Sequence, residues 1–142
     1  MSEVITCTFN DSHITSQIFE IRTKVFVIEQ KVSREEEFDE FEASSVHYLG
    51  KAGDVPAATA RWRITNTGIK LERFAVLSEF RNSGLGTKVL NKVLVDVIPL
   101  NIPIYLNAQV KAIRFYEKAG FRKIGKMFIE ADIEHFKMTF VV

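Results

Sequence analysis

An arginine and two glycines lie between a predicted strand and a predicted helix, in the order Arg81-x-x-Gly84-x-Gly86. Glycine lets a ligand approach the backbone closely because it carries no Cβ. The first amide groups of a helix have no partner within the helix, and the helix dipole makes that end partly positive. Arg81 adds a fixed positive charge. The segment therefore predicts a site for a phosphate or pyrophosphate group.

Two common phosphate-binding motifs do not fit this loop. A Walker A loop needs Gly-Lys-Ser/Thr, but Gly86 is followed by Thr87-Lys88. A dinucleotide fingerprint needs a small residue where Val89 stands, and it belongs to an early strand–helix–strand unit. Here three predicted strands precede the loop without a helix between them. The loop is therefore not expected to bind a nucleotide in either of these ways.

The elements that position this loop follow from hydrophobic periodicity and from turn residues. Ile14, Ile18, Ile21, Val25 and Ile28 recur every three or four positions and predict one helix. The order of elements predicts an α/β (α+β layered) fold with helices on both faces of a sheet. We expect strands at 4–9, 46–49, 57–64, 69–77, 102–106, 121–124 and 135–142, and helices at 12–30, 84–98 and 110–119.

The composition is that of a globular domain, with 142 residues of which 46% are hydrophobic and 26% charged. One domain spanning 1–142 is long enough to bury a core. With a formal charge of only +1, the chain lacks the excess of positive charge that favours binding to nucleic acids or anionic membranes, and we expect neither partner. No apolar run is long enough for a membrane span, the N-terminus lacks a signal pattern, and Cys7 alone cannot form an internal disulfide. These features predict a cytoplasmic protein.

Acidic residues crowd the segment 35–42, with Phe38 and Phe41 among them. A solvated acidic loop or short helix is one interpretation. The other is a rim that attracts a cationic substrate. The sequence leaves both open.

Three segments together resemble the GNAT superfamily of N-acetyltransferases. Arg81-x-x-Gly84-x-Gly86 matches its acyl-CoA pyrophosphate loop, Gln/Arg-x-x-Gly-x-Gly/Ala. Asn107-Ala108-Gln109, followed by A-x-x-F-Y-x-x-x-G-F over 112–121, looks like the second conserved block of that family. Arg22-x-x-Val25-Phe26-Val27-x-Glu29-Gln30 resembles the first helix of a bacterial branch, the ElaA/YjcF-like acetyltransferases. The resemblance covers nearly the whole chain.

The resemblance implies a mixed, mostly antiparallel central sheet in which two parallel strands splay apart around acetyl-CoA. These strands would be 71–77 and 104–109. The main chain of the first would pair with the pantetheine arm, and the loop amides would hold the pyrophosphate. The bulky segment 77–80 departs from the usual pattern and leaves the detail of the loop open. The implied cofactor-binding residues are Phe74, Ala75, Val76, Arg81, Asn82, Ser83, Gly84, Leu85, Gly86, Thr87 and Asn107.

The reaction implied is attack of an amine on the acetyl carbonyl, which requires an acid and a base. Tyr116 matches the tyrosine that lies near the CoA sulfur in the family and would act as the acid; alternatively, its hydroxyl caps a backbone group. Glu72 alternates with Phe74 and Val76 on one strand face, where a raised pKa would suit a base. The alternative is that Glu72 forms an ion pair with a residue of a neighbouring strand, such as Arg61 or Arg63.

Other polar residues are weaker candidates. His47 begins a central strand and would orient the acceptor or relay a proton, unless it is structural. Glu29 and Gln30 end the first helix, where related enzymes build the acceptor pocket. His135 is interpreted only as a strand residue. No Cys/His cluster has the spacing of metal ligands, so we predict no metal.

These observations predict an acetyl-CoA-dependent N-acetyltransferase that acts on a small-molecule amine. Acidic residues at 35–42 favour a cationic acceptor, although the fold does not fix the substrate. Apolar strand edges near the C-terminus, at 136–142, could pair between two chains in a homodimer, but the sequence leaves the oligomeric state open. One alternative is a non-catalytic sensor module that binds acyl-CoA, and another is a nucleotide-dependent enzyme that uses the same loop.

Overall fold

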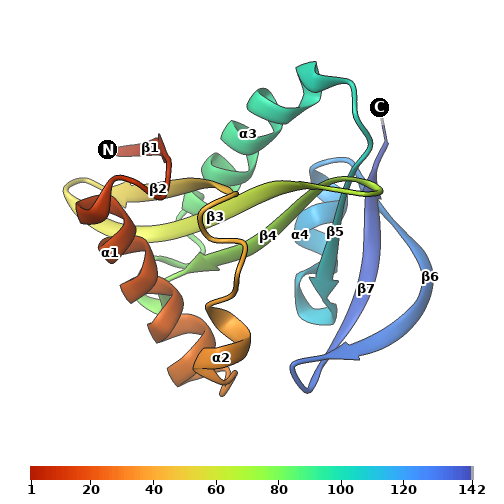
Figure 1. The fold of residues 1–142 in the computed structure, drawn as a ribbon, viewed down its shortest axis with the longest axis horizontal. Coiled ribbons are helices and arrows are strands. Elements are labelled where there is room, and N and C mark those ends of the chain that lie inside the picture. The colour runs from red at the N-terminus through yellow and green to blue at the C-terminus, as the bar shows by residue number, and fades with distance from the viewer. Residues whose placement is uncertain (142) are drawn as a thin grey trace.

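The computed structural model describes residues 1–141, and its framework is a seven-stranded sheet in the order β1-β2-β3-β4-β5-β7-β6 (Figure 1). Only β4 and β5 pair in parallel; all other neighbours are antiparallel. The sheet is thus mixed and mostly antiparallel, as expected. Val142, the last residue of the predicted final strand, lies outside the described residues. The strands are β1 (Ser2–Cys7), β2 (Val46–Ala52), β3 (Val55–Thr65), β4 (Gly68–Val76), β5 (Ile104–Gln109), β6 (Phe121–Glu130) and β7 (Ile133–Phe140).

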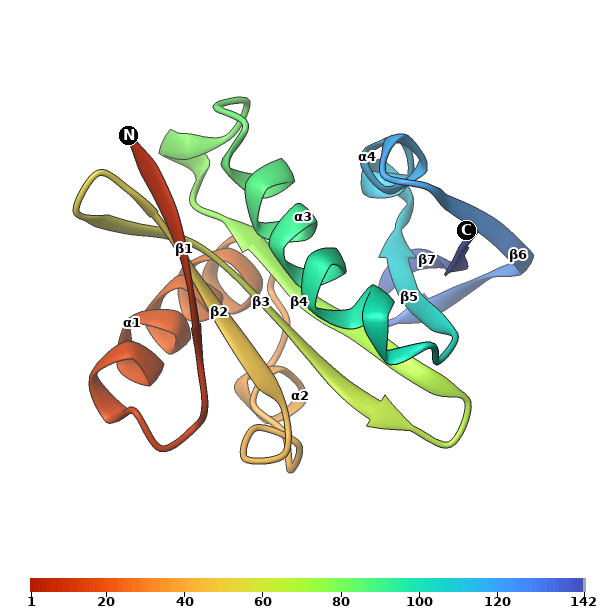
Figure 2. The same cartoon turned by 90° about the horizontal axis from the view of Figure 1, so that it is seen from above.

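Helices α3 (Leu85–Val97) and α4 (Ile113–Lys118) cover one face of the sheet. The apolar residues of α3 recur at helical spacing and are buried, including Leu85, Val89 and Val93. They pack against Leu71 of β4 and against the buried side chains of β2, β3 and β5. This core fixes the start of α3 close to the end of β4, so that the predicted anion-binding loop lies beyond the C-terminal end of β4, the central strand of the sheet (Figure 2).

Helix α1 (Ser12–Arg22) lies on the opposite face, and the chain continues from it as a π-helix over Thr23–Glu29. Its i→i+5 bond from the Gln30 N–H to the Val25 carbonyl measures 3.1 Å. The predicted apolar stripe is therefore broken near its end. Val25 and Phe26 are buried, whereas Ile28 is 60% exposed. The change of helix type, which periodicity at 3.6 residues per turn does not foresee, turns Ile28 towards solvent.

Strands β4 and β5 pair over only three positions, from Ile69 with Ile104 to Leu71 with Leu106. Beyond this point β4 keeps its pairing with β3 and β5 keeps its pairing with β7, so that a gap opens between the two parallel strands. The register of β4 against β3 shifts in the same region, and Arg73 takes a left-handed backbone with φ of 61°. The splayed pair expected for 71–77 and 104–109 is confirmed.

The acidic segment is not a solvated loop. It contains the short helix α2 (Arg34–Glu37), and Glu37 and Glu42 are buried. Both carboxylates bind the guanidinium of Arg22, at 2.8 Å in each case. Glu42 also binds Arg61, a fully buried arginine of β3, at 2.8 Å. Buried charges must be paired, and here the partners are arginines of the chain itself rather than a cationic substrate.

A third acidic side chain of this segment, Asp39, binds Arg61 with an N–O distance of 2.7 Å and Arg73 at 3.1 Å. Glu35, Glu36 and Glu40 remain exposed. The segment therefore mainly connects α1 to the sheet through ion pairs with Arg22 and Arg61. Within residues 1–141, no helix is both long enough and apolar enough to cross a membrane.

Candidate active site

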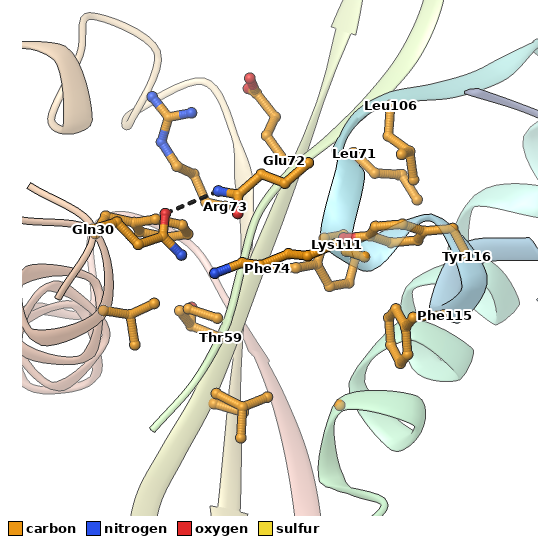
Figure 3. A pocket seen from close by; sticks show the side chains of 18 of the residues that line it. Gln30, Thr59, Leu71, Glu72, Arg73, Phe74, Leu106, Lys111, Phe115 and Tyr116 are labelled. Carbon is orange, nitrogen blue, oxygen red and sulfur yellow. Dashed lines mark hydrogen bonds between the residues drawn. The ribbon is translucent and has the colours of Figure 1, made fainter. Parts of the chain in front are cut away.

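A cleft of about 830 Å³ occupies the gap between the splayed ends of β4 and β5. It runs from the first turn of α3 on one face of the sheet to the end of the π-helix on the other face. Figure 3 shows Tyr116 and Phe115 of α4 on one side of this cleft and Gln30 on the other, with Glu72 and Phe74 of β4 between them. The opening of a parallel strand pair thus connects the two faces of the sheet.

The loop before α3 leaves amide groups without partners. Gly84 occupies the N-cap position with φ of 87° and has no side chain to cap the helix. A Cβ on Gly86 would lie 3.4 Å from Val76 and 3.6 Å from Phe115, so glycine keeps this part of the cleft open. The dipole of the 13-residue helix α3 also places a partial positive charge at this end of the helix. The loop residues that line the cleft are Arg81, Asn82, Gly84, Gly86 and Thr87.

Two residues of the predicted loop set do not line the cleft. The Ser83 hydroxyl donates a hydrogen bond to the Phe80 carbonyl, and Leu85 is buried in the core beneath α3. Both side chains therefore support the loop rather than face the cleft.

The open part of β4 supplies the wall of the cleft. Phe74, Ala75 and Val76 all line it, as does Asn107 on the facing strand β5. Because β5 has diverged, no strand within residues 1–141 pairs with this edge of β4 beyond Leu71. An edge of this kind can accept an extended ligand by backbone hydrogen bonding.

Tyr116 stands at the inner end of the cleft among aromatic rings. The rings of Phe74, Phe115 and Phe121 pack edge-on with the Tyr116 ring, with 5.1–6.0 Å between the ring centroids. Burial raises the pKa of the Tyr116 phenol, which stays protonated at neutral pH. Among the described residues the hydroxyl has no hydrogen-bond partner, so the backbone-cap alternative is not the arrangement observed.

Glu72 is buried and held by cations. Its Oε1 accepts hydrogen bonds from Arg63 at 2.6 Å and from Arg61 at 2.9 Å, and Lys70 lies 3.3 Å from Oε2. Burial alone would raise the pKa of this carboxyl, but Arg61 and the other cations outweigh burial and lower it. This geometry is the ion-pair alternative, and it does not suit a general base near neutrality.

The chain matches the family model described as the acetyltransferase (GNAT) domain over residues 11–142. The chain belongs to the GNAT acetyltransferase family. Among its relatives is YjcF of Bacillus subtilis, named an uncharacterized N-acetyltransferase, which is 40% identical over 124 residues and covers 84% of this chain and 87% of its own. The match places the chain in the ElaA/YjcF-like branch.

Solved structures of GNAT proteins share the fold. The crystal structure of Escherichia coli ElaA superposes with a TM-score of 0.89 at 23% identity and covers 99% of this chain and 100% of ElaA. An aminoglycoside 6′-N-acetyltransferase complexed with coenzyme A superposes with a TM-score of 0.71 at 16% identity and covers 95% of each chain. At these identities the likeness establishes the fold.

In this member of the GNAT family, His47 lies outside the cleft. It sits on β2, two strands away from the β4–β5 gap, opposite Cys7 and Arg61. Its Nε2 is 2.8 Å from the Glu42 carbonyl oxygen, and burial lowers its pKa. The predicted role in the reaction is corrected to a structural one, because a side chain that is 2% exposed and bonded to a neighbouring loop reaches no acceptor.

Glu29 and Gln30, the two residues that end the first helical segment, differ in their position relative to the cleft. Gln30 lines the cleft, and its Oε1 accepts a hydrogen bond of 2.9 Å from Gln109 of β5, across the opening. Glu29 does not line the cleft. It is paired with Arg81 instead, and the prediction that both residues face an acceptor is corrected for Glu29.

Several cleft residues are absent from the sequence-based site. Gln109, Lys111 and Arg73 line the cleft, and so do Glu130 and His135 of the β6–β7 hairpin. The hairpin lies late in the chain and carries no motif, so only the pairing of β7 with β5 reveals its position. Among residues 1–141, no three His, Cys, Asp or Glu side chains cluster as metal ligands do.

Proposed function

We propose that this protein is an N-acetyltransferase that transfers the acetyl group of acetyl-CoA to a small-molecule amine. The observation that carries the proposal is the alignment of three features along one cleft: the uncapped first turn of α3, the unpaired edge of β4, and the Tyr116 phenol. Each meets a different part of an acyl-CoA molecule, namely the diphosphate, the pantetheine arm and the thioester.

The residues present fit acetyl-CoA. The amides from Gly84 to Thr87 point out of an uncapped helix, where a diphosphate is stabilised by hydrogen bonds and by the helix dipole. Gly86 leaves the space that a Cβ would fill beside Phe115. The backbone of Phe74, Ala75 and Val76 offers hydrogen-bonding groups to the amides of an extended arm.

Tyr116 acts as the acid of this proposed reaction. Its hydroxyl belongs to a buried side chain among aromatic rings, where a hydrogen bond to a developing thiolate is strong. The raised pKa keeps the proton on the phenol until the sulfur departs. Asn107 and Gln109 lie on β5 near the open end, where they can orient the acyl group or the acceptor.

One observation favours the alternative of a sensor that binds acyl-CoA without turnover. Glu72, the carboxylate considered as a base from the sequence, accepts hydrogen bonds from Arg61 and Arg63 instead. Tyr116 favours an enzyme, because a binding module has no need of a phenol beside the thioester. Turnover separates the two functions.

The first experiment is a calorimetric titration with acetyl-CoA, with ATP and NAD as controls. We expect micromolar acetyl-CoA binding and no heat from either control. An assay for free thiol across a panel of primary amines (spermidine, glucosamine, tyramine and lysine) then tests transfer. Binding without thiol release from any amine identifies the sensor, and stronger binding of ATP or NAD identifies a nucleotide site.

A further inference from the structure

We propose that His135 is the group that accepts a proton from the attacking amine. This inference rests on the proposed acetyl transfer and adds the base that Glu72 and His47 do not provide. His135 lies on β7, lines the cleft, and is only 6% exposed.

His135 lies on the face of the sheet from which an amine would enter. It pairs directly with Gln109 of β5, and paired residues of antiparallel strands project from the same face. The Gln109 amide reaches across the opening to Gln30 at the end of the π-helix. Tyr116 belongs to α4 and packs with the core on the α3 side. Acid and base therefore approach the gap from opposite faces.

The structure fixes the tautomer of the imidazole. Nδ1 lies 2.7 Å from the backbone carbonyl oxygen of Ile133. A carbonyl oxygen can only accept, so Nδ1 carries the proton and donates it. In the neutral ring Nε2 then holds the free lone pair. The ring is stacked on Phe128, with 5.6 Å between centroids and 20° between planes, which holds its orientation.

A carboxylate lies near the free nitrogen. The Glu130 carboxylate of β6 lies 3.8 Å from Nε2, lines the same cleft and is half exposed. The neighbours from β5 and from the paired position of β6 are Gln109 and Phe128, which do not titrate. The negative charge of Glu130 therefore lies close to the position of the proton that Nε2 would accept.

The buried carboxylates of the cleft are committed elsewhere. Glu72 binds Arg61 and Arg63, and Glu37 binds Arg22 and Arg73. Each already pairs with guanidinium groups, so taking up a proton would remove one of the negative charges that balance these arginines. Within the described part of the chain, His135 is paired with no guanidinium group.

In the proposed transfer, two protons leave the substrate nitrogen. Nε2 of His135 takes one proton from the substrate ammonium group and later releases it to solvent. The neutral amine forms a bond to the acetyl carbon, and the carbon–sulfur bond breaks with its electron pair remaining on sulfur. Tyr116 stabilises that sulfur through its hydroxyl. The nitrogen loses a second proton when the amide forms, and the departing sulfur gains one proton to become the thiol. Overall, a substrate ammonium group and a thioester give an amide, a thiol and one proton released to solvent.

The test compares His135→Gln with Glu134→Gln, a change on the adjacent, exposed position of the same strand. The assay measures kcat with the most active amine of the panel, and calorimetry measures acetyl-CoA binding. We expect His135→Gln to lower kcat by about 100-fold or more while the Kd for acetyl-CoA stays within about threefold. Glu134→Gln should retain the wild-type kcat.

A second variant separates chemistry from folding. His135→Ala leaves room for free imidazole, and added imidazole should restore part of its kcat, whereas it should not affect Tyr116→Phe. A purely structural role predicts no rescue, and absence of rescue in a folded His135→Ala protein overturns the proposal. So does a His135→Gln enzyme with wild-type kcat. If the wild-type protein itself releases no thiol with any amine, the proposed acetyl transfer is overturned, and the proposed role of His135 is overturned with it.

Discussion

Glu29 accepts hydrogen bonds from both terminal nitrogens of Arg81, and each N–O distance is 2.7 Å. The pair joins the end of the π-helix to the loop that opens α3. Arg81 is further held by the bond of its Nε to the Val76 carbonyl. The guanidinium that the sequence assigns to a phosphate is thus already engaged by a carboxylate of the same chain, and the two anions would compete for it.

Glu29→Gln should therefore strengthen acetyl-CoA binding. Removing the carboxylate frees the Arg81 guanidinium and takes a negative charge away from the proposed diphosphate site. Both side chains are more than a third exposed, so solvent screens the effect. We expect the Kd to fall about two- to fivefold at about 0.05 M salt and the gain to vanish at about 0.5 M. Glu20→Gln, on the exposed face of α1, is the control. Weaker binding in Glu29→Gln would contradict the competition.

Tyr116→Phe should lower turnover without weakening the cofactor complex. The substitution keeps the packing against Phe74 and Phe121 but removes the hydroxyl that stabilises the departing sulfur. We expect kcat to fall about 10- to 100-fold with the acetyl-CoA Kd within a few-fold. Tyr105→Phe removes a phenol bonded to Thr65 and should leave kcat unchanged. An active Tyr116→Phe enzyme would remove Tyr116 from the mechanism.

Gly84→Asp should weaken acetyl-CoA binding about tenfold or more, because a side chain and a negative charge enter the site that offers free amides to the diphosphate. Gly84 has φ of 87°, so the substitution also strains the backbone. Gly53→Asp is a matched control, since Gly53 also has positive φ and open space around it but lies in the β2–β3 turn. Calorimetry compares the two variants. Equal affinities would show that the loop is not the diphosphate site.

Asp39 should make the fold sensitive to acid. Burial alone would raise the pKa of its carboxyl, but hydrogen bonds and charge from Arg61 outweigh burial and lower the pKa to about 2. A lowered pKa stabilises the fold above the ordinary value of 3.8, and that contribution is lost as the pH falls towards 2. Between about pH 5 and about pH 3, the wild type should lose about 1 kcal/mol more stability than Asp39→Asn. Urea unfolding at both pH values measures the difference, and equal losses would contradict it.

The local parts of the site could be predicted from the sequence. Gly84 and Gly86 before a strongly periodic helix specify an uncapped N-terminus, because the chemistry lies within a few consecutive residues. Tyr116 follows from its place in a short block on α4. The splay of β4 from β5 came from the family resemblance rather than from the pattern of either strand.

The carboxylates could not be assigned in this way. Glu72 and Glu42 meet arginines that lie 11 and 20 residues away along the chain, and only the packed sheet shows which charges share a buried space. The sequence therefore left Glu72 open between a base and an ion pair. It also treated residues 35–42 as a surface feature, whereas burial and pairing with Arg22 and Arg61 make them part of the framework.

The sequence by itself determined the family, the anion-binding loop and the tyrosine, since each depends on spacing within one turn or one helix. Only the tertiary structure decided the partners of charged groups, the π-helical end of the first helical segment and the place of His135. The reason is that β7 reaches the cleft by pairing with β5 across more than 20 residues of chain. Long-range pairing brings together residues that no local pattern relates.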